Sequence, residues 1–153
     1  MRRGLLVFAC LSLIGAVACS KTEPQRKAVE YGDALGIEFG DATTGRYLAA
    51  VAAEKGHSPE NGVPALATAL HAAAKGCPML ASETKDAPAT NPPTLHFLVK
   101  GGSLEAVPPS AADPPPPPSV VCMAKGMSGK PANLEAPTPY ELTIQLMAKK
   151  AGE

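Results

Sequence analysis

The chain has 153 residues, and its 14 lysines and arginines balance 14 aspartates and glutamates, so the formal net charge is zero. This balance argues against the strongly basic surface expected of a nucleic-acid-binding protein. Aromatic residues make up 4% of the chain and tryptophan is absent, so alanine, leucine and valine must build the core. The length fits one modest domain, whose core is expected to be thin.

The segment 1–18 has the pattern of a secretory signal peptide. Arg2 and Arg3 precede an apolar run, residues 5–18, which ends in Ala-Val-Ala directly before Cys19. The run is about 15 residues long, whereas a membrane-spanning helix needs roughly 20. We therefore expect the mature protein to begin at Cys19.

The small residues before Cys19 resemble the lipobox of bacterial lipoproteins. The resemblance implies that the Cys19 thiol receives a diacylglyceryl group and that the new amine is acylated after cleavage. Because Ser20 rather than aspartate follows, it also implies a location in the bacterial cell envelope, on the periplasmic face of the outer membrane. The sequence departs from the lipobox at Ala16, where leucine is usual. Simple secretion is the alternative, since the same residues suit a soluble-protein signal peptidase.

We divide the chain into a signal peptide at 1–18, a lipidated N-terminus and tether at 19–42, and an α+β domain at 43–153. The tether assignment depends on its first residues, which are mostly polar or charged and include Pro24. Residues 28–39 show only weak helical patterning, interrupted by glycines.

Two helices are predicted at the start of the domain. The first follows Thr44, a suitable N-cap, and ends at Gly56. The second covers residues 64–75, since proline suits a first helical turn and Gly76 a C-terminal stop. Its apolar stripe has spacings of three and four and comprises Val63, Leu66, Leu70, Ala74 and Cys77.

A β-hairpin is predicted around residues 101–102. Residues Thr94–Lys100 alternate between apolar and polar, which is typical of a strand with one buried face. The Gly-Gly pair that follows is a turn of the kind that joins antiparallel strands. Folding the chain there matches the apolar faces of the two strands. The predicted pairs are Val99 with Leu104 and Phe97 with Ala106.

A proline-rich loop is expected at residues 108–118, of which 114–118 are five consecutive prolines. Such a run adopts polyproline II and cannot lie inside a sheet. We interpret it as a stiff spacer, with a ligand for a proline-binding module as the alternative. A short helix at 119–127 and a final strand at 140–147 complete the chain.

The cysteine count leaves one candidate pair. Cys10 is removed with the signal peptide and Cys19 is assigned to lipid, so Cys77 and Cys122 remain in an oxidising compartment. We expect a disulfide between them, with free thiols or metal ligation as alternatives. The predicted fold class is α+β: a small antiparallel sheet, made of the hairpin and the C-terminal strand, packed by two or three helices.

The order helix, strand, strand, helix, strand over about residues 63–148 resembles the TonB-related C-terminal domains of bacterial envelope proteins, particularly a gliding-motility variety. The matching features are Cys77 on one helix, the Gly-turn hairpin, Cys122 on the next helix, and a proline-containing loop before the last strand. The sequence departs from the pattern at Lys130 and Pro131, where an aromatic-proline step is expected, and in its proline run. The resemblance implies a partner-binding domain whose exposed strand pairs with another protein, and not an enzyme.

The sequence contains no motif for catalysis or cofactor binding. His57, His71 and His96 fall in a predicted loop, helix and strand without metal-ligand spacing, and His96 belongs to the outward strand face. We therefore expect no catalytic residue, metal or cofactor. The function predicted is that of a lipid-anchored envelope protein with a non-catalytic protein-binding or structural role. Its partners would be the membrane, through the lipid, and an unidentified envelope protein, not nucleic acid.

The alternative function is periplasmic copper binding. Soft sulfur ligands select Cu(I), and two helices that meet would bring several together. These residues are Cys77, Met79, Cys122, Met123 and Met127. His71, two turns before Cys77, could add a nitrogen ligand. The competing interpretation is that the methionines fill the core and the cysteines are oxidised.

Overall fold

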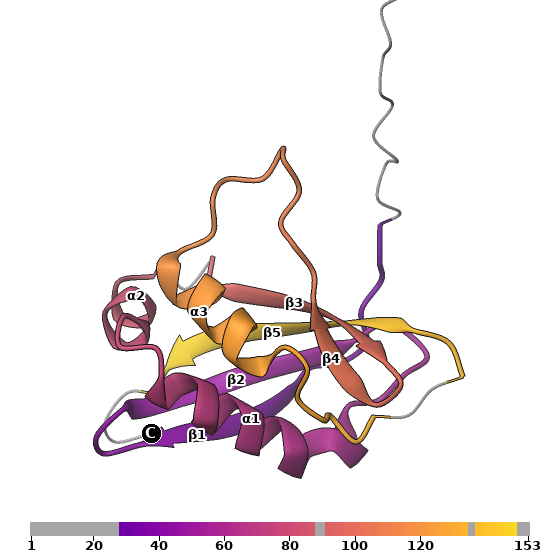
Figure 1. Ribbon diagram of the computed structural model, residues 1–153, viewed down its shortest axis with the longest axis horizontal. Helices are drawn as coiled ribbons and strands as arrows, with labels where there is room; N and C mark the ends of the chain where they lie inside the picture. Colours follow the sequence, from indigo (N-terminus) through magenta and orange to yellow (C-terminus); the bar gives the residue numbers. More distant parts are fainter. Residues whose placement is uncertain (1–27, 88–90, 135–136, 150–153) are drawn as a thin grey trace, which may run out of the picture.

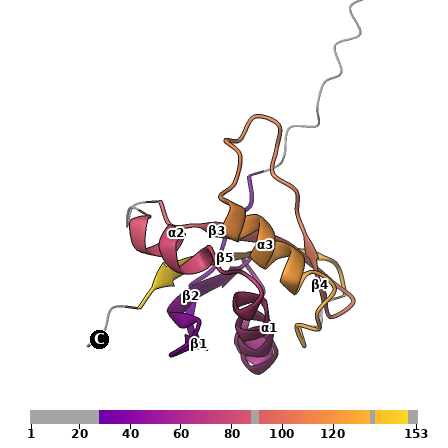
Figure 2. The ribbon, with the colours of Figure 1, turned by 60° about the vertical axis from the view of Figure 1, so that its left-hand side comes forward.

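The computed structural model describes residues 28–87, 91–134 and 137–149. The predicted signal peptide, Cys19 and the start of the tether lie outside the described residues. The described chain forms a five-stranded antiparallel sheet with strand order β1-β2-β5-β3-β4, and three α-helices pack against one face of it (Figures 1 and 2). The predicted α+β class is confirmed, with two more strands than we expected.

The connections between elements are short except for residues 107–117 and 128–139. In chain order they are β1 (Leu35–Asp41), β2 (Gly45–Ala53), a 3-10 turn (Glu60–Gly62), α1 (Val63–Lys75), α2 (Leu80–Asp86), β3 (Thr94–Lys100), β4 (Ser103–Ala106), α3 (Pro118–Met127) and β5 (Tyr140–Ala148). The predicted helices at 64–75 and 119–127 are confirmed as α1 and α3, and the predicted last strand is confirmed as β5.

The helix predicted between Thr44 and Gly56 is wrong, because this segment contains the strand β2. Its burial alternates from residue to residue, with Tyr47, Ala49, Val51 and Ala53 facing the helices. Alanine and leucine favour a helix locally, but β2 pairs with β1 on one side and β5 on the other. These backbone ladders and the burial of one face outweigh the local preference.

β1 lies inside the range 19–42 that we assigned to the tether, so the sheet begins before residue 43. The weak helical patterning over residues 28–39 is therefore misleading, since residues 35–39 belong to this strand. Gly40 and Gly45 flank the turn between β1 and β2 with φ values of 87° and 92°. Side chains other than glycine rarely adopt these angles, so the two glycines permit the hairpin.

The hairpin between β3 and β4 has the predicted register. Val99 pairs with Leu104, and Phe97 pairs with Ala106. Gly101 and Gly102 form the turn with φ values of 56° and 76°. Positive φ at both central residues is what the tightest hairpin turns require.

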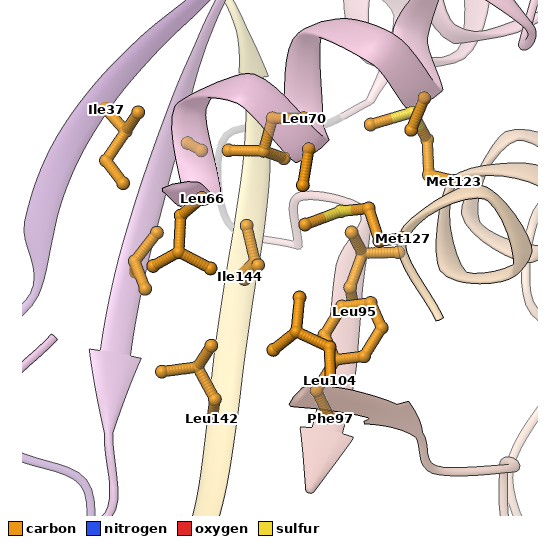
Figure 3. Close-up of a cluster of buried hydrophobic side chains, with 14 of the residues drawn as sticks. Ile37, Leu66, Leu70, Leu95, Phe97, Leu104, Met123, Met127, Leu142 and Ile144 are labelled. Carbon is orange, nitrogen blue, oxygen red and sulfur yellow. The ribbon is translucent and has the colours of Figure 1, made fainter. Parts of the chain in front are cut away.

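A single core fills the space between the sheet and the helices (Figure 3). Leu66 and Leu70 of α1 and Met123 and Met127 of α3 lie above the sheet and are at most 1% exposed. The buried side chains of the sheet below them include Leu95, Phe97, Leu104, Leu142 and Ile144. Alternate residues of each strand supply this face, which is why the strands read as alternating patterns.

The predicted pairing of Cys77 with Cys122 is confirmed at disulfide distance. The two sulfur atoms lie 2.09 Å apart and the Cα atoms 5.8 Å apart, within the geometry of a disulfide bond. Cys77 follows the end of α1 and Cys122 lies inside α3. The bond therefore links α1 and α3, two of the three helices that cover the sheet.

Candidate functional site

The two edge strands of the sheet, β4 and β1, differ in whether other parts of the chain hydrogen-bond to their outer sides. Beyond β4, the chain that follows α3 lies against the strand and closes its outer side. The Leu104 N–H donates to the Lys130 carbonyl at 3.0 Å, and the Gly129 N–H donates to the Leu104 carbonyl at 2.7 Å. The Ala132 N–H donates to the Gly102 carbonyl at 2.8 Å. The outward N–H and C=O of Leu104 and the Gly102 carbonyl, at the start of β4, are therefore occupied.

The outer edge of β1 has no such cover among residues 28–87, 91–134 and 137–149. β1 pairs with β2 along all seven of its residues, and no other described strand or loop hydrogen-bonds to its backbone from outside. An edge strand carries alternating N–H and C=O groups on its open side. We call this side of β1 the uncovered edge.

An open groove of about 490 Å³ lies between β1 and α1. Its lining residues are Glu38, Phe39 and Gly40 from β1, and Ala67, Thr68, His71, Ala72 and Lys75 from α1. The Phe39 ring is held in place by stacking on Tyr47, with ring centroids 5.1 Å apart. The α1 wall consists largely of alanine and threonine, whose short side chains leave space beside the strand.

Asp41 sits at one end of the groove in a tight turn. One of its carboxylate oxygens accepts hydrogen bonds from the Thr44 and Thr43 N–H groups, both at 2.8 Å. These bonds lower the pKa of Asp41 below its ordinary value of 3.8. The other oxygen lies 3.9 Å from His71 Nε2. Asp41 is therefore engaged within its own chain.

Glu38 is also engaged, because its carboxylate forms an ion pair with Lys149. The hydrogen bond from Lys149 lowers the pKa of Glu38. Lys75, on the opposite wall, forms no ion pair with any described residue. Its charge acts on Asp41 only from beyond contact distance, as one of the weaker influences that lower the pKa of that carboxyl. The ammonium of Lys75 is thus available to a ligand.

The three histidines lie apart from one another. His57 stacks on Tyr140 with ring centroids 4.0 Å apart, His71 lines the groove, and His96 is exposed on β3. The described part of the chain contains no group of three His, Cys, Asp or Glu side chains placed to hold a metal ion. Histidine therefore enters the candidate site only through His71.

Four of the five sulfur atoms considered for copper have other places in the fold. Cys77 and Cys122 lie at disulfide distance from each other. Met123 and Met127 are 0% exposed in the core, whereas Met79 is 51% exposed. A disulfide offers no thiolate, so Cys77 and Cys122 provide no thiolate ligand while they are bonded to each other.

The groove is not predicted from the sequence, because the residues of β1 are assigned there to the tether and those of β2 to a helix. One signal was available: Ile37 and Phe39 alternate with polar or small residues before a turn that contains two threonines and Gly45. The position of α1 beside β1 is set by tertiary packing and leaves no local pattern.

Comparisons with profiles of protein families, with curated protein sequences and with solved structures found no match. The resemblance to TonB-related domains stays a prediction. Within the described ranges, no helix combines the length and the apolar character needed to cross a bilayer.

Proposed function

We propose that this chain is a lipid-anchored protein of the bacterial cell envelope with a non-catalytic, protein-binding role, and that the groove between β1 and α1 is its binding surface. The observation that carries the proposal is the difference between the two sheet edges. Residues 129–132 hydrogen-bond to Gly102 and Leu104 on the outer side of β4, whereas no described residue hydrogen-bonds to the outer edge of β1. Proteins usually protect long edge strands, and partner binding explains why a strand of seven residues is left open.

The chemistry of the groove supports binding over catalysis. Ala67 and Ala72 offer apolar contact surface, and Phe39, which is 6% exposed, forms the apolar base of the groove. Two carboxylates at the groove, Glu38 and Asp41, are already engaged by Lys149 and by backbone N–H groups, and the His71 ring lies 3.9 Å from the Asp41 carboxylate. A general base must be free to reach the proton that it removes, and neither carboxylate meets that need.

The lipid anchor is a separate part of the proposal, supported by the resemblance of the residues before Cys19 to a lipobox. Mass spectrometry of the N-terminal peptide from the envelope fraction tests it. We expect Cys19 with a diacylglyceryl group on sulfur and an acyl chain on the amine. An unmodified Cys19 amine would remove the anchor from the proposal and leave the groove as a binding surface.

The binding role is tested by photo-crosslinking in intact cells. A photoreactive amino acid at Ala72, in the groove, is compared with one at Lys85, on α2 and outside it. We expect one discrete protein adduct from the Ala72 position, reduced when Lys75→Glu is added, and no matching adduct from Lys85. Equal adducts from both positions, or none from Ala72, would contradict a role for the groove.

A further inference from the structure

We infer that the groove binds an extended, acidic peptide segment of its partner as a sixth strand, paired with the uncovered edge of β1, with a peptide carboxylate beside Lys75. This inference rests on the proposed function and names the kind of segment that the site accepts. Three features of the described residues carry it: the open backbone of β1, the short side chains of α1, and the distribution of charge.

The backbone of β1 requires an extended ligand. The outward N–H and C=O groups of an edge strand alternate along its length, and only another extended chain presents matching groups at the same spacing. In this mode of recognition the main-chain hydrogen bonds supply affinity, and alternate side chains enter the adjoining pocket. The added strand would continue a sheet that already pairs β1 with β2 along seven residues.

The α1 wall limits which side chains fit beside the added strand. Figures 1 and 2 show α1 lying alongside β1, and Ala67, Thr68 and Ala72 face the groove from the helix. These short side chains leave room for every second peptide side chain between strand and helix. On the strand side, the buried Phe39 ring forms the apolar base of the groove.

The charges of the groove favour a carboxylate on the ligand. Glu38 is paired with Lys149, and Asp41 accepts hydrogen bonds from Thr43 and Thr44. Lys75 has no ion-pair partner in the described part of the chain. A peptide carboxylate would pair with this ammonium, whereas a peptide lysine at that place would be repelled.

The first test is selection from a phage-displayed library of random peptides of roughly ten residues, the upper range of strand length, with the full mature chain in detergent as bait. Enriched peptides should lack proline at their centre and share one aspartate or glutamate position. The best peptide is then synthesised with single N-methyl groups along its backbone. Methylation should weaken binding roughly tenfold at every second residue and little between them, because only alternate N–H groups face β1. Failure to enrich peptides, or the absence of this alternation, would overturn strand addition.

The second test reverses the charge of the α1 wall. Lys75→Glu is compared with Lys125→Glu, because each lysine occupies the last turn of its helix. Both changes place a negative charge at a helix C-terminus, so their effects on helix stability should be similar. Lys75→Glu should weaken binding of the selected peptide by roughly fivefold, and a lysine in place of the peptide's acid should restore it. Lys125→Glu should leave affinity unchanged. Equal effects of the two variants would overturn the assignment of Lys75. If these tests fail while crosslinking at Ala72 persists, the groove binds its partner in another way.

Discussion

Phe97 and Leu98 are neighbours in β3, but only the Phe97 side chain is enclosed by the core. Phe97 is 0% exposed, and Leu98 lies on the other face of the sheet, half-buried. Phe97→Ala should lower the free energy of unfolding by about 3–5 kcal/mol, because it removes a large apolar contact and leaves a cavity. Leu98→Ala should cost less than about 1.5 kcal/mol, since its side chain keeps contact with solvent. Chemical denaturation measures both free energies of unfolding. Similar losses for the two variants would contradict the assignment of Phe97 to the core face of β3 and Leu98 to the other face.

The hydrogen bonds that Asp41 accepts should be detectable as a lowered pKa of its carboxyl group. Backbone bonds from Thr44 and Thr43 lower its folded-state pKa, so its contribution to stability is complete above the ordinary value of 3.8 and is lost as the pH falls through the lowered value. A nuclear magnetic resonance titration should place the carboxyl midpoint below 3.8, with the Thr43 and Thr44 amide signals moving at the same pH. Asp41→Asn should abolish that step in the amide signals. A midpoint at or above the ordinary value would be inconsistent with this turn.

At the scale of elements, the disulfide joins the end of α1 to α3 across a sequence separation of 45 residues. Closing a loop of this length restricts the unfolded chain and should stabilise the fold by about 4 kcal/mol. The double variant Cys77→Ser with Cys122→Ser should lose most of this free energy in guanidinium denaturation. In reductant, the free energy of unfolding of the unmodified chain should equal that of the double variant. If reductant leaves the free energy of unfolding of the unmodified chain unchanged, the disulfide bond is contradicted.

The elements predicted correctly from sequence are those whose ends carry local signals. Pro64 and Gly76 mark α1, and the glycine pair at 101–102 marks the hairpin and its register. β2 was missed because alanine occupies both of its faces, at residues 49, 50, 52 and 53, which weakens the period-two pattern. β1 and the groove were missed because they depend on pairing with β2 and packing by α1. These are long-range contacts without a local sequence signal.

At the scale of the whole molecule, the two edges of the sheet differ: residues 129–132 hydrogen-bond to the outer side of β4, whereas no described residue does so at β1. The proline-rich residues 107–117 project from the body between β4 and α3, at the end away from β1 in Figures 1 and 2. The loop therefore does not cover the groove. The loop connects two elements that pack together, β4 and α3, and its interpretation as a stiff spacer stays a prediction.

The central claim is that a partner strand completes the uncovered edge of β1. Amide hydrogen exchange, read by mass spectrometry on the full mature chain with and without the crosslinked partner, tests it most directly. In the free chain, outward amides within Leu35–Asp41 should exchange quickly, whereas the Leu104 amide, bonded to Lys130, should be protected. With the partner bound, β1 should become protected and β4 should not change. Protection that arises at residues 107–117 or on the helices, with β1 still exchanging quickly, would contradict the account.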